Sequence, residues 1–106
     1  MQFVSVQIVR FVDPDFPGWV ECKLVDADGR LHIIKDKVPI FTAELLDDES
    51  KYPATGSMPC EVVERFRDAR GRELVRVSTE EAGIESVERT SQFTLTADLV
   101  TTDPIK

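Results

Sequence analysis

The stretch from Gly18 to Pro39, GWVECKLVDADGRLHIIKDKVP, constrains the fold most strongly, because a turn signature separates two strand-like runs. The segment Asp26–Gly29 suits a type I turn followed by a left-handed residue, a conformation that glycine adopts without a Cβ penalty. A β-hairpin is therefore predicted, and the turn sets its register. The predicted opposing residues are Val25 and Leu31, Leu24 and His32, Lys23 and Ile33, Cys22 and Ile34, and Glu21 and Lys35.

This register divides the hairpin into two faces. Glu21 and Lys35 form an opposite-charge pair on the solvent face, which is typical of a half-buried antiparallel pair of strands. Near the turn the second face is also apolar, so we expect another part of the chain to cover that end. The predicted inward residues are Val20, Cys22, Leu24 and Ile34.

A second hairpin is predicted from Cys60 to Thr79, since Asp68–Arg72 repeats the turn chemistry of the first. The same register rule places opposite charges and apolar residues in matching pairs, which supports it. The predicted pairs are Arg67 with Glu73, Phe66 with Leu74, Arg65 with Val75, Glu64 with Arg76 and Val63 with Val77.

The rest of the chain also favours strands. The alternation in 3–12 changes phase near Val9, which indicates a bulge or a strand bent between two sheets. Residues 13–18, 49–59 and 79–83 have turn or loop composition. A short strand is predicted at 83–87 and a clear one at 92–100, with Phe93, Leu95 and Ala97 inward.

One short helix is predicted near 43–48. Thr42 can cap it, and Phe41 can pack against Leu46 from just before the cap. Asp47 and Asp48 would lie at its unfavourable C-terminal end, so the helix should stop there.

Six or seven strands with hairpin-length connections predict an all-β fold, and a small antiparallel barrel is favoured over a closely packed sandwich. The architecture resembles small barrels of the OB, SH3-like or translation-factor kind, a likeness of fold that implies no particular function. We expect a single domain over 1–100 and a flexible C-terminal tail over 101–106. An unpaired edge strand leaves monomer and homodimer both open.

The formal net charge of -7 argues against nucleic acid or an anionic membrane as the main partner, and solubility is its simplest explanation. The N-terminus lacks the pattern of a signal peptide and no apolar run reaches membrane-spanning length, so a cytoplasmic protein is expected. Cys22 and Cys60 are too few for a disulfide framework. Buried thiols are expected, although a bridge stays open if their strands are neighbours.

No catalytic or metal-binding motif is found. His32, the single histidine, has no recognisable orienting partner in the sequence, and a structural role in or beside the core is favoured. Ser57 lacks the second glycine of a nucleophile elbow. The acidic loops at 13–18 and 26–29 fail the spacing of a calcium loop, and neither a zinc site nor a glycine-rich phosphate loop is present. We therefore expect no enzyme, no cofactor and no metal.

The charged and aromatic residues suggest surfaces instead. Arginines crowd the second hairpin, but neighbouring carboxylates can pair with them, so a nucleic-acid face is disfavoured. Phe16, Trp19 and Tyr52 are the candidate binding residues, as aromatic side chains are favoured interface anchors. For Trp19, capping an open barrel end is the favoured role.

Three functional hypotheses follow from these surfaces. The first is a non-enzymatic protein-interaction or regulatory module. The second is a small-molecule binder or minor enzyme with a pocket at the barrel mouth. A toxin-neutralising, immunity-type inhibitor is a special case of the first. The third is nucleic-acid binding through the arginine-rich second hairpin, which the paired charges disfavour.

Overall fold

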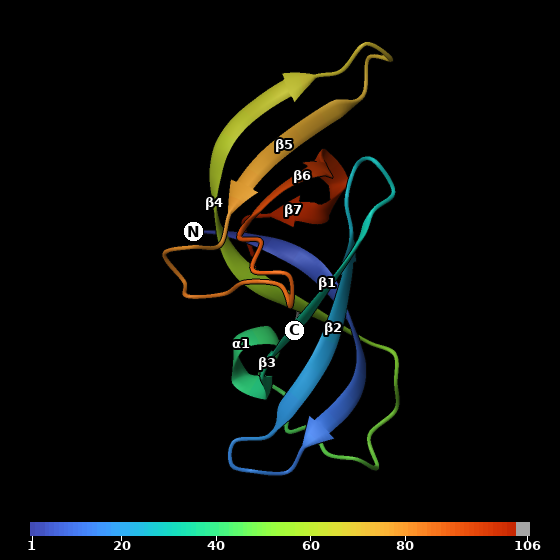
Figure 1. Cartoon of the computed structure of the whole chain (residues 1–106), viewed down its shortest axis with the longest axis vertical. Helices are drawn as coiled ribbons and strands as arrows, with labels where there is room; N and C mark the ends of the chain where they lie inside the picture. Colours follow the sequence, from blue (N-terminus) through green and yellow to red (C-terminus); the bar gives the residue numbers. More distant parts are fainter. Residues whose placement is uncertain (104–106) are drawn as a thin grey trace.

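The structure is a computed structural model that describes residues 1–103, and seven antiparallel strands form one curled sheet, a half-barrel (Figure 1). The strand order is β3-β2-β1-β4-β5-β6, and β7 pairs with β1. The predicted all-β antiparallel class and strand number are confirmed. The strands are β1 (Gln2–Asp13), β2 (Trp19–Val25), β3 (Leu31–Lys37), β4 (Ala54–Arg67), β5 (Glu73–Ser78), β6 (Gln92–Thr96) and β7 (Val100–Thr101).

The first hairpin, β2 and β3, has the predicted register from Val25 opposite Leu31 to Glu21 opposite Lys35. Its turn is closed by the N–H of Gly29, which donates to the carbonyl oxygen of Asp26 at 3.0 Å. The predicted inward residues Val20, Cys22, Leu24 and Ile34 are all at most 3% exposed. The expected cover near the turn is wrong for Val25 and Leu31, which are 48% and 49% exposed.

The second hairpin, β4 and β5, has the predicted pairs from Arg67 opposite Glu73 to Glu64 opposite Arg76. The last predicted pair is wrong, because Val62 rather than Val63 opposes Val77. A β-bulge at this point inserts one extra residue into β4, and Val63 is left 55% exposed.

The predicted irregularity in the first strand is confirmed by register shifts after Ile8 and Phe11. The predicted loop 49–59 is wrong from Ala54 onward, because β4 already begins there and pairs with β1 through Cys60. Loop-like residues fit this strand for local reasons. Pro59 is tolerated where β4 is paired on one edge only, and a Cβ on Gly56 would lie 2.9 Å from Ile8.

The predicted helix at 43–48 is wrong in position. Helix α1 spans Val38–Phe41, directly after β3, and residues 43–48 are irregular. Pro39 suits a first helical turn, and the side chains of Val38 and Phe41 are buried. The Thr42 hydroxyl accepts a hydrogen bond from the N–H of Glu44 at 3.1 Å, which forms a turn instead of a helix cap.

The C-terminal third differs from the expectation in three places. Residues 83–87 form no strand, although Ile84 is buried at 2% exposure. The last long strand ends at Thr96, with a 3₁₀ turn at Ala97–Leu99. Thr101 belongs to β7 and pairs with Phe3 instead of starting the tail. Residues 102–103 form an exposed bend, and residues 104–106 of the predicted tail lie outside the described residues.

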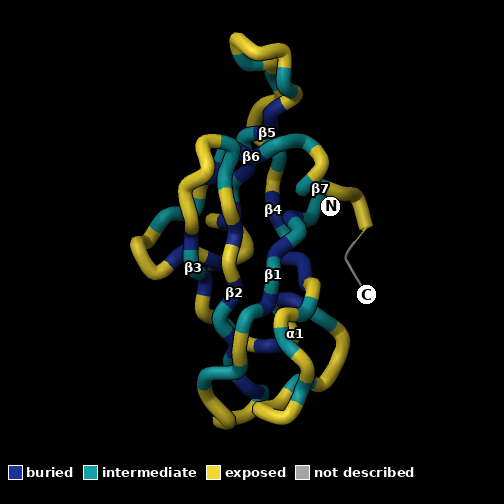
Figure 2. The backbone as a smooth tube through the Cα atoms, turned by 90° about the vertical axis from the view of Figure 1, so that its right-hand side faces the viewer, coloured by how far each residue is buried: buried dark blue, intermediate teal, exposed yellow. Residues whose placement is uncertain are grey.

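One apolar core fills the half-barrel, and the tips of the hairpins and loops are the exposed parts (Figure 2). The open side of the sheet is closed by backbone contacts. The N–H of Ala27 donates to the carbonyl of Thr94 at 2.9 Å, and the N–H of Val87 donates to the carbonyl of Ile33 at 2.8 Å. No helix within residues 1–103 is long and apolar enough to cross a membrane.

Candidate functional site

The turn 13–18 and the loop 42–53 lie together at one end of the molecule, the lower end in Figure 1, and we call this region the loop end. A groove of about 520 Å³ runs between them. Its lining combines an apolar floor with carboxylates and contains no lysine or arginine. The lining residues are Phe11, Val12, Asp13, Pro14, Phe16, Pro17, Gly18, Leu46, Asp47 and Asp48.

Phe16 is the most exposed aromatic residue of the loop end, with 97% of its surface open to solvent. Two hydrogen bonds span its turn. The N–H of Gly18 donates to the carbonyl of Asp15 at 2.7 Å, and the N–H of Asp15 donates to Oδ1 of Asp13 at 2.9 Å. The aromatic ring is therefore presented by a short, hydrogen-bonded turn.

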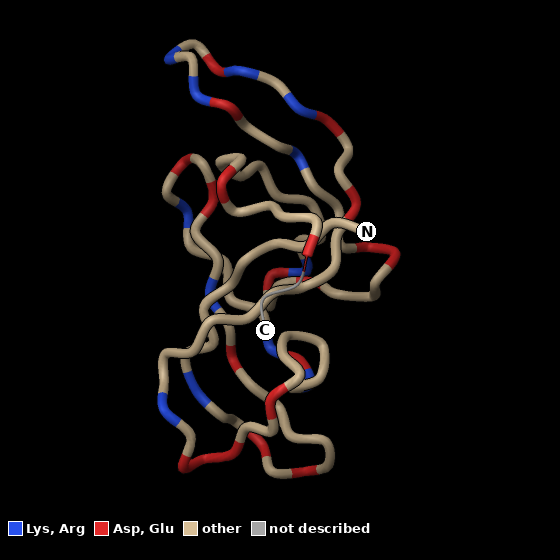
Figure 3. The backbone as a smooth tube through the Cα atoms, turned by 180° about the vertical axis from the view of Figure 1, so that it is seen from behind, with Lys and Arg blue, Asp and Glu red and all other residues tan. Residues whose placement is uncertain are grey.

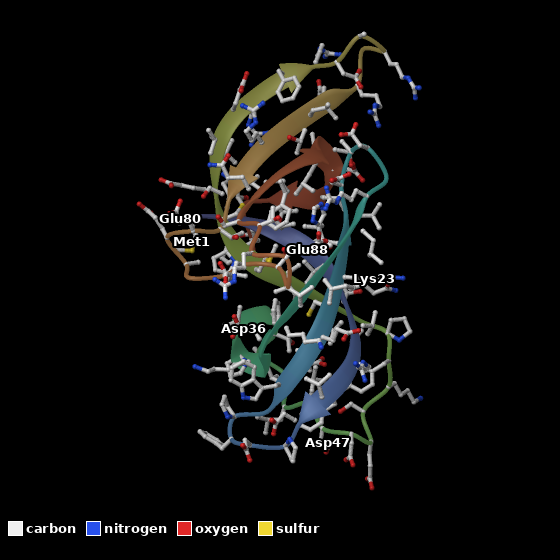
Figure 4. All side chains as sticks on the ribbon, in the orientation of Figure 1. Met1, Lys23, Asp36, Asp47, Glu80 and Glu88 are labelled. Atoms are coloured by element: carbon white, nitrogen blue, oxygen red, sulfur yellow. The ribbon has the colours of Figure 1, made fainter. Side chains whose placement is uncertain are left out.

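Several acidic residues lie along the backbone of the loop end (Figure 3). Asp47 is one of them and is labelled in Figure 4. Asp47 organises its own loop, since its Oδ1 accepts the N–H of Glu49 at 2.9 Å. Its carbonyl accepts the hydroxyl of Tyr52 at 2.6 Å. The carboxylates that line the groove thus sit on hydrogen-bonded loops beside Phe16.

The three predicted binding residues have different surroundings. Phe16 lines the groove, but Trp19 and Tyr52 do not. Trp19 is half-buried, with Nζ of Lys37 5.6 Å from its ring centre. Tyr52 packs against the core and fixes the loop through Asp47; burial is the largest cause of its raised pKa. Sequence reasoning missed Leu45, which is 98% exposed in the same loop, because that segment was expected to be helical.

His32 has an orienting partner that the sequence did not reveal. Its Nε2 lies 2.8 Å from Oδ2 of Asp26, in the turn of its own hairpin. The ring is 6% exposed and meets Phe93 edge-on at 5.0 Å between centroids. Nδ1 is buried and has no hydrogen-bond partner within residues 1–103. The ring therefore lies in the core, which is where the favoured interpretation placed it.

The pKa of Asp26 results from opposing effects. Burial raises it, but hydrogen bonds from His32 and from the N–H groups of Arg30 and Asp28 lower it further than burial raises it. The net pKa is below the ordinary value, so Asp26 stays ionised beside the histidine.

The two thiols are free and buried, as predicted. Burial raises the pKa of Cys22 to about 12 and that of Cys60 to about 11. Because thiolate is the reactive form, the raised pKa lowers the reactivity of both thiols near neutral pH. Within residues 1–103 no group of three or more histidine, cysteine, aspartate and glutamate residues is placed to hold a metal ion.

The arginines of the second hairpin pair with carboxylates across the strands, as predicted. Arg67 lies 2.8 Å from Glu73, and Arg76 lies 2.7 Å from Glu64. These two pairs neutralise part of the positive charge of the hairpin locally.

A second cavity, of about 610 Å³, lies where β1 begins, between β4 and the turn after β5. Its floor is mainly apolar, and two glutamates line it. The lining residues are Met1, Gln2, Pro59, Cys60, Glu61, Val62, Ser78, Glu81 and Ala82. We call it the mouth cavity.

Comparisons with protein-family models, with curated proteins and with solved structures find no match for this chain. The surfaces described above therefore carry the functional argument.

Proposed function

We propose that the protein is a non-enzymatic module that binds another protein through its loop end, and that the partner surface is basic. The observation that carries this proposal is Phe16, a fully exposed aromatic ring on a hydrogen-bonded turn, at the rim of a groove lined by carboxylates.

The energetics of interfaces support an anchor at this position. Interface energy is concentrated in a few large side chains, and a backbone turn that is already ordered loses less entropy on binding. Leu45, on the loop that forms the other side of the groove, is 98% exposed. One exposed phenylalanine alone would be ordinary; its combination with Leu45 and a groove is the stronger signal.

Charge indicates the chemistry of the partner. Asp13, Asp47 and Asp48 line the groove without a basic side chain among the lining residues, and the whole chain carries a net charge of -7. A basic surface would be attracted at long range and would find complementary groups at contact. A toxin-neutralising role is one form of this function, because an acidic inhibitor can cover a basic surface.

The test places a photo-crosslinking phenylalanine analogue at position 16 and, as a matched control, at position 87. Val87 is also an exposed apolar residue, 56% open to solvent, but does not line the groove. We expect one basic protein from the native host to be crosslinked from position 16 and not from position 87.

The crosslinked protein is then purified and its binding measured by calorimetry. We expect Phe16→Ser to weaken its affinity at least about tenfold and Val87→Ser to leave it unchanged. Raising the salt concentration should weaken binding of the wild type. Equal crosslinking from both positions, or an unchanged affinity of Phe16→Ser, would rule out the loop end as the binding surface.

A further inference from the structure

The mouth cavity results from the way the core of the half-barrel ends. Met58, Cys60 and Val62 alternate along the inward side of β4, and their exposure increases in that order from 0% to 8% to half-buried. The ladder between β1 and β4 stops at the first residue of β1, Gln2, which lies opposite Cys60. Beyond that pair no strand within residues 1–103 covers this edge of β4, so the end of the core is open to solvent.

The opposite wall comes from the turn that follows β5. Ser78 opposes Glu61 at the end of the β4–β5 ladder, and the chain then turns through Glu80–Gly83, where the N–H of Gly83 donates to the carbonyl of Glu80 at 2.9 Å. Figure 4 shows Met1 and Glu80 close together at this side of the molecule. The cavity thus has walls from the start of β1, from β4 and from a hydrogen-bonded turn.

Its size and chemistry match those of sites for small molecules. A volume of about 610 Å³ lies within the usual range of such pockets, which are mostly apolar with a few polar groups. The side chains of Pro59, Cys60, Val62 and Ala82 supply apolar surface. No lysine or arginine is among the lining residues.

The charge at the mouth is negative. Glu61 and Glu81 line the cavity, are exposed, and form no ion pair within residues 1–103. Carboxylates at the rim of an apolar cavity favour a ligand whose apolar body is buried while a cationic group stays at the rim.

We propose that the mouth cavity binds a small organic cation, a molecule with an apolar body and one ammonium group. This site is separate from the loop end, and none of its lining residues belongs to the groove beside Phe16. The inference therefore does not rest on the proposed protein partner.

The test uses a pair of probes of nearly equal shape, phenethylammonium and the neutral 2-phenylethanol, titrated into the ¹⁵N-labelled protein. We expect the cation to shift the amide signals of residues 60–62 and 80–82, with a dissociation constant of the order of a millimolar. The neutral probe should bind about threefold to tenfold more weakly. Shifts at the loop end instead, no shifts at about 10 mM, or equal binding of both probes would each overturn the proposal.

Variants on the exposed turn change the binding site while leaving the folded core intact. Ala82→Trp, which fills the cavity from a solvent-exposed position, should abolish the shifts. Glu81→Gln should weaken the cation about threefold and leave the neutral probe unchanged. Glu85→Gln is the matched control, since Glu85 is exposed but does not line the cavity, and it should leave both affinities unchanged. If circular dichroism shows that Ala82→Trp is folded and the variant still binds the cation, the mouth cavity is not the binding site.

Discussion

The two hairpins begin their turns in the same way and then differ in what surrounds them. In the first, Oδ1 of Asp26 accepts the N–H groups of Asp28 and Arg30 at 2.9 and 3.0 Å. In the second, Oδ1 of Asp68 accepts those of Arg70 and Arg72 at 3.0 and 2.9 Å. The backbone of both turns is therefore organised by one aspartate oxygen.

The second oxygen of each aspartate makes the difference. Oδ2 of Asp26 lies 2.8 Å from Nε2 of the buried His32 ring. Oδ2 of Asp68 lies 2.8 Å from Nε of Arg72, whose side chain is 39% exposed. Six residues after the aspartate, the first hairpin carries His32 and the second carries Leu74. The first turn is thus tied to the core through His32, whereas the second is tied through Arg72 to the first turn, since Nη1 of Arg72 donates to the carbonyl of Ala27 at 3.1 Å.

The largest expected difference follows from removing the two aspartates. Asp26→Ala should lower the free energy of unfolding by about 2 to 3 kcal/mol, because Nε2 of His32 would be left buried without an acceptor. Asp68→Ala should lower it clearly less, since water can replace the carboxylate at Arg72. Urea denaturation of both variants measures the difference.

A double variant provides the control for this comparison. In Asp26→Ala/His32→Leu the orphaned nitrogen is replaced by the residue type found at the equivalent position of the second hairpin. It should recover part of the stability lost in Asp26→Ala. Equal losses for the two aspartates, or no recovery, would show that the buried histidine does not distinguish the hairpins.

The two turn glycines should respond alike. Gly29 and Gly71 have φ angles of 81° and 79°, and a Cβ at either position would meet no atom within 4 Å. Gly29→Ala and Gly71→Ala should each lower the free energy of unfolding by about 1 kcal/mol, because only the left-handed backbone is penalised. A much larger loss for one of them in urea denaturation would mean that the two turns differ locally after all.

The smallest expected difference concerns acid stability. The pKa of Asp26 in the folded protein is below its ordinary value. Its contribution to the free energy of unfolding is therefore fully present above the unfolded pKa and is lost as the pH falls through the folded pKa. We expect the wild type to lose stability below about pH 4. Asp26→Asn should lose less over the same window, as urea midpoints between pH 5 and pH 2 would show. A wild-type curve parallel to that of the variant would exclude Asp26 as a source of the acid sensitivity.

The features that could be predicted were those set by nearby residues. Turn chemistry and side-chain alternation gave the first hairpin its full register and the second all but its last pair. Phe16 could be singled out because an aromatic residue stood in a turn. Sequence reasoning did not locate the mouth cavity, since no local pattern shows that β1 begins opposite Cys60.

The remaining features depended on contacts between distant segments. Residues 54–59 have the composition of a loop, but pairing with β1 makes them a strand, and the space beside Ile8 accounts for Gly56. The helix formed at 38–41 rather than at 43–48, because Val38 and Phe41 reach the core while the capping signal at Thr42 produces only a turn.

By itself, the sequence determined an all-β chain with two hairpins in defined register, because hydrogen bonds within a four-residue turn and alternation along a strand need no distant partner. Only the tertiary structure decided which hairpin is buried, how far β4 extends, and where the loop end and the mouth cavity open. Those features depend on which surfaces remain uncovered once the strands have paired, and that is a property of the whole sheet.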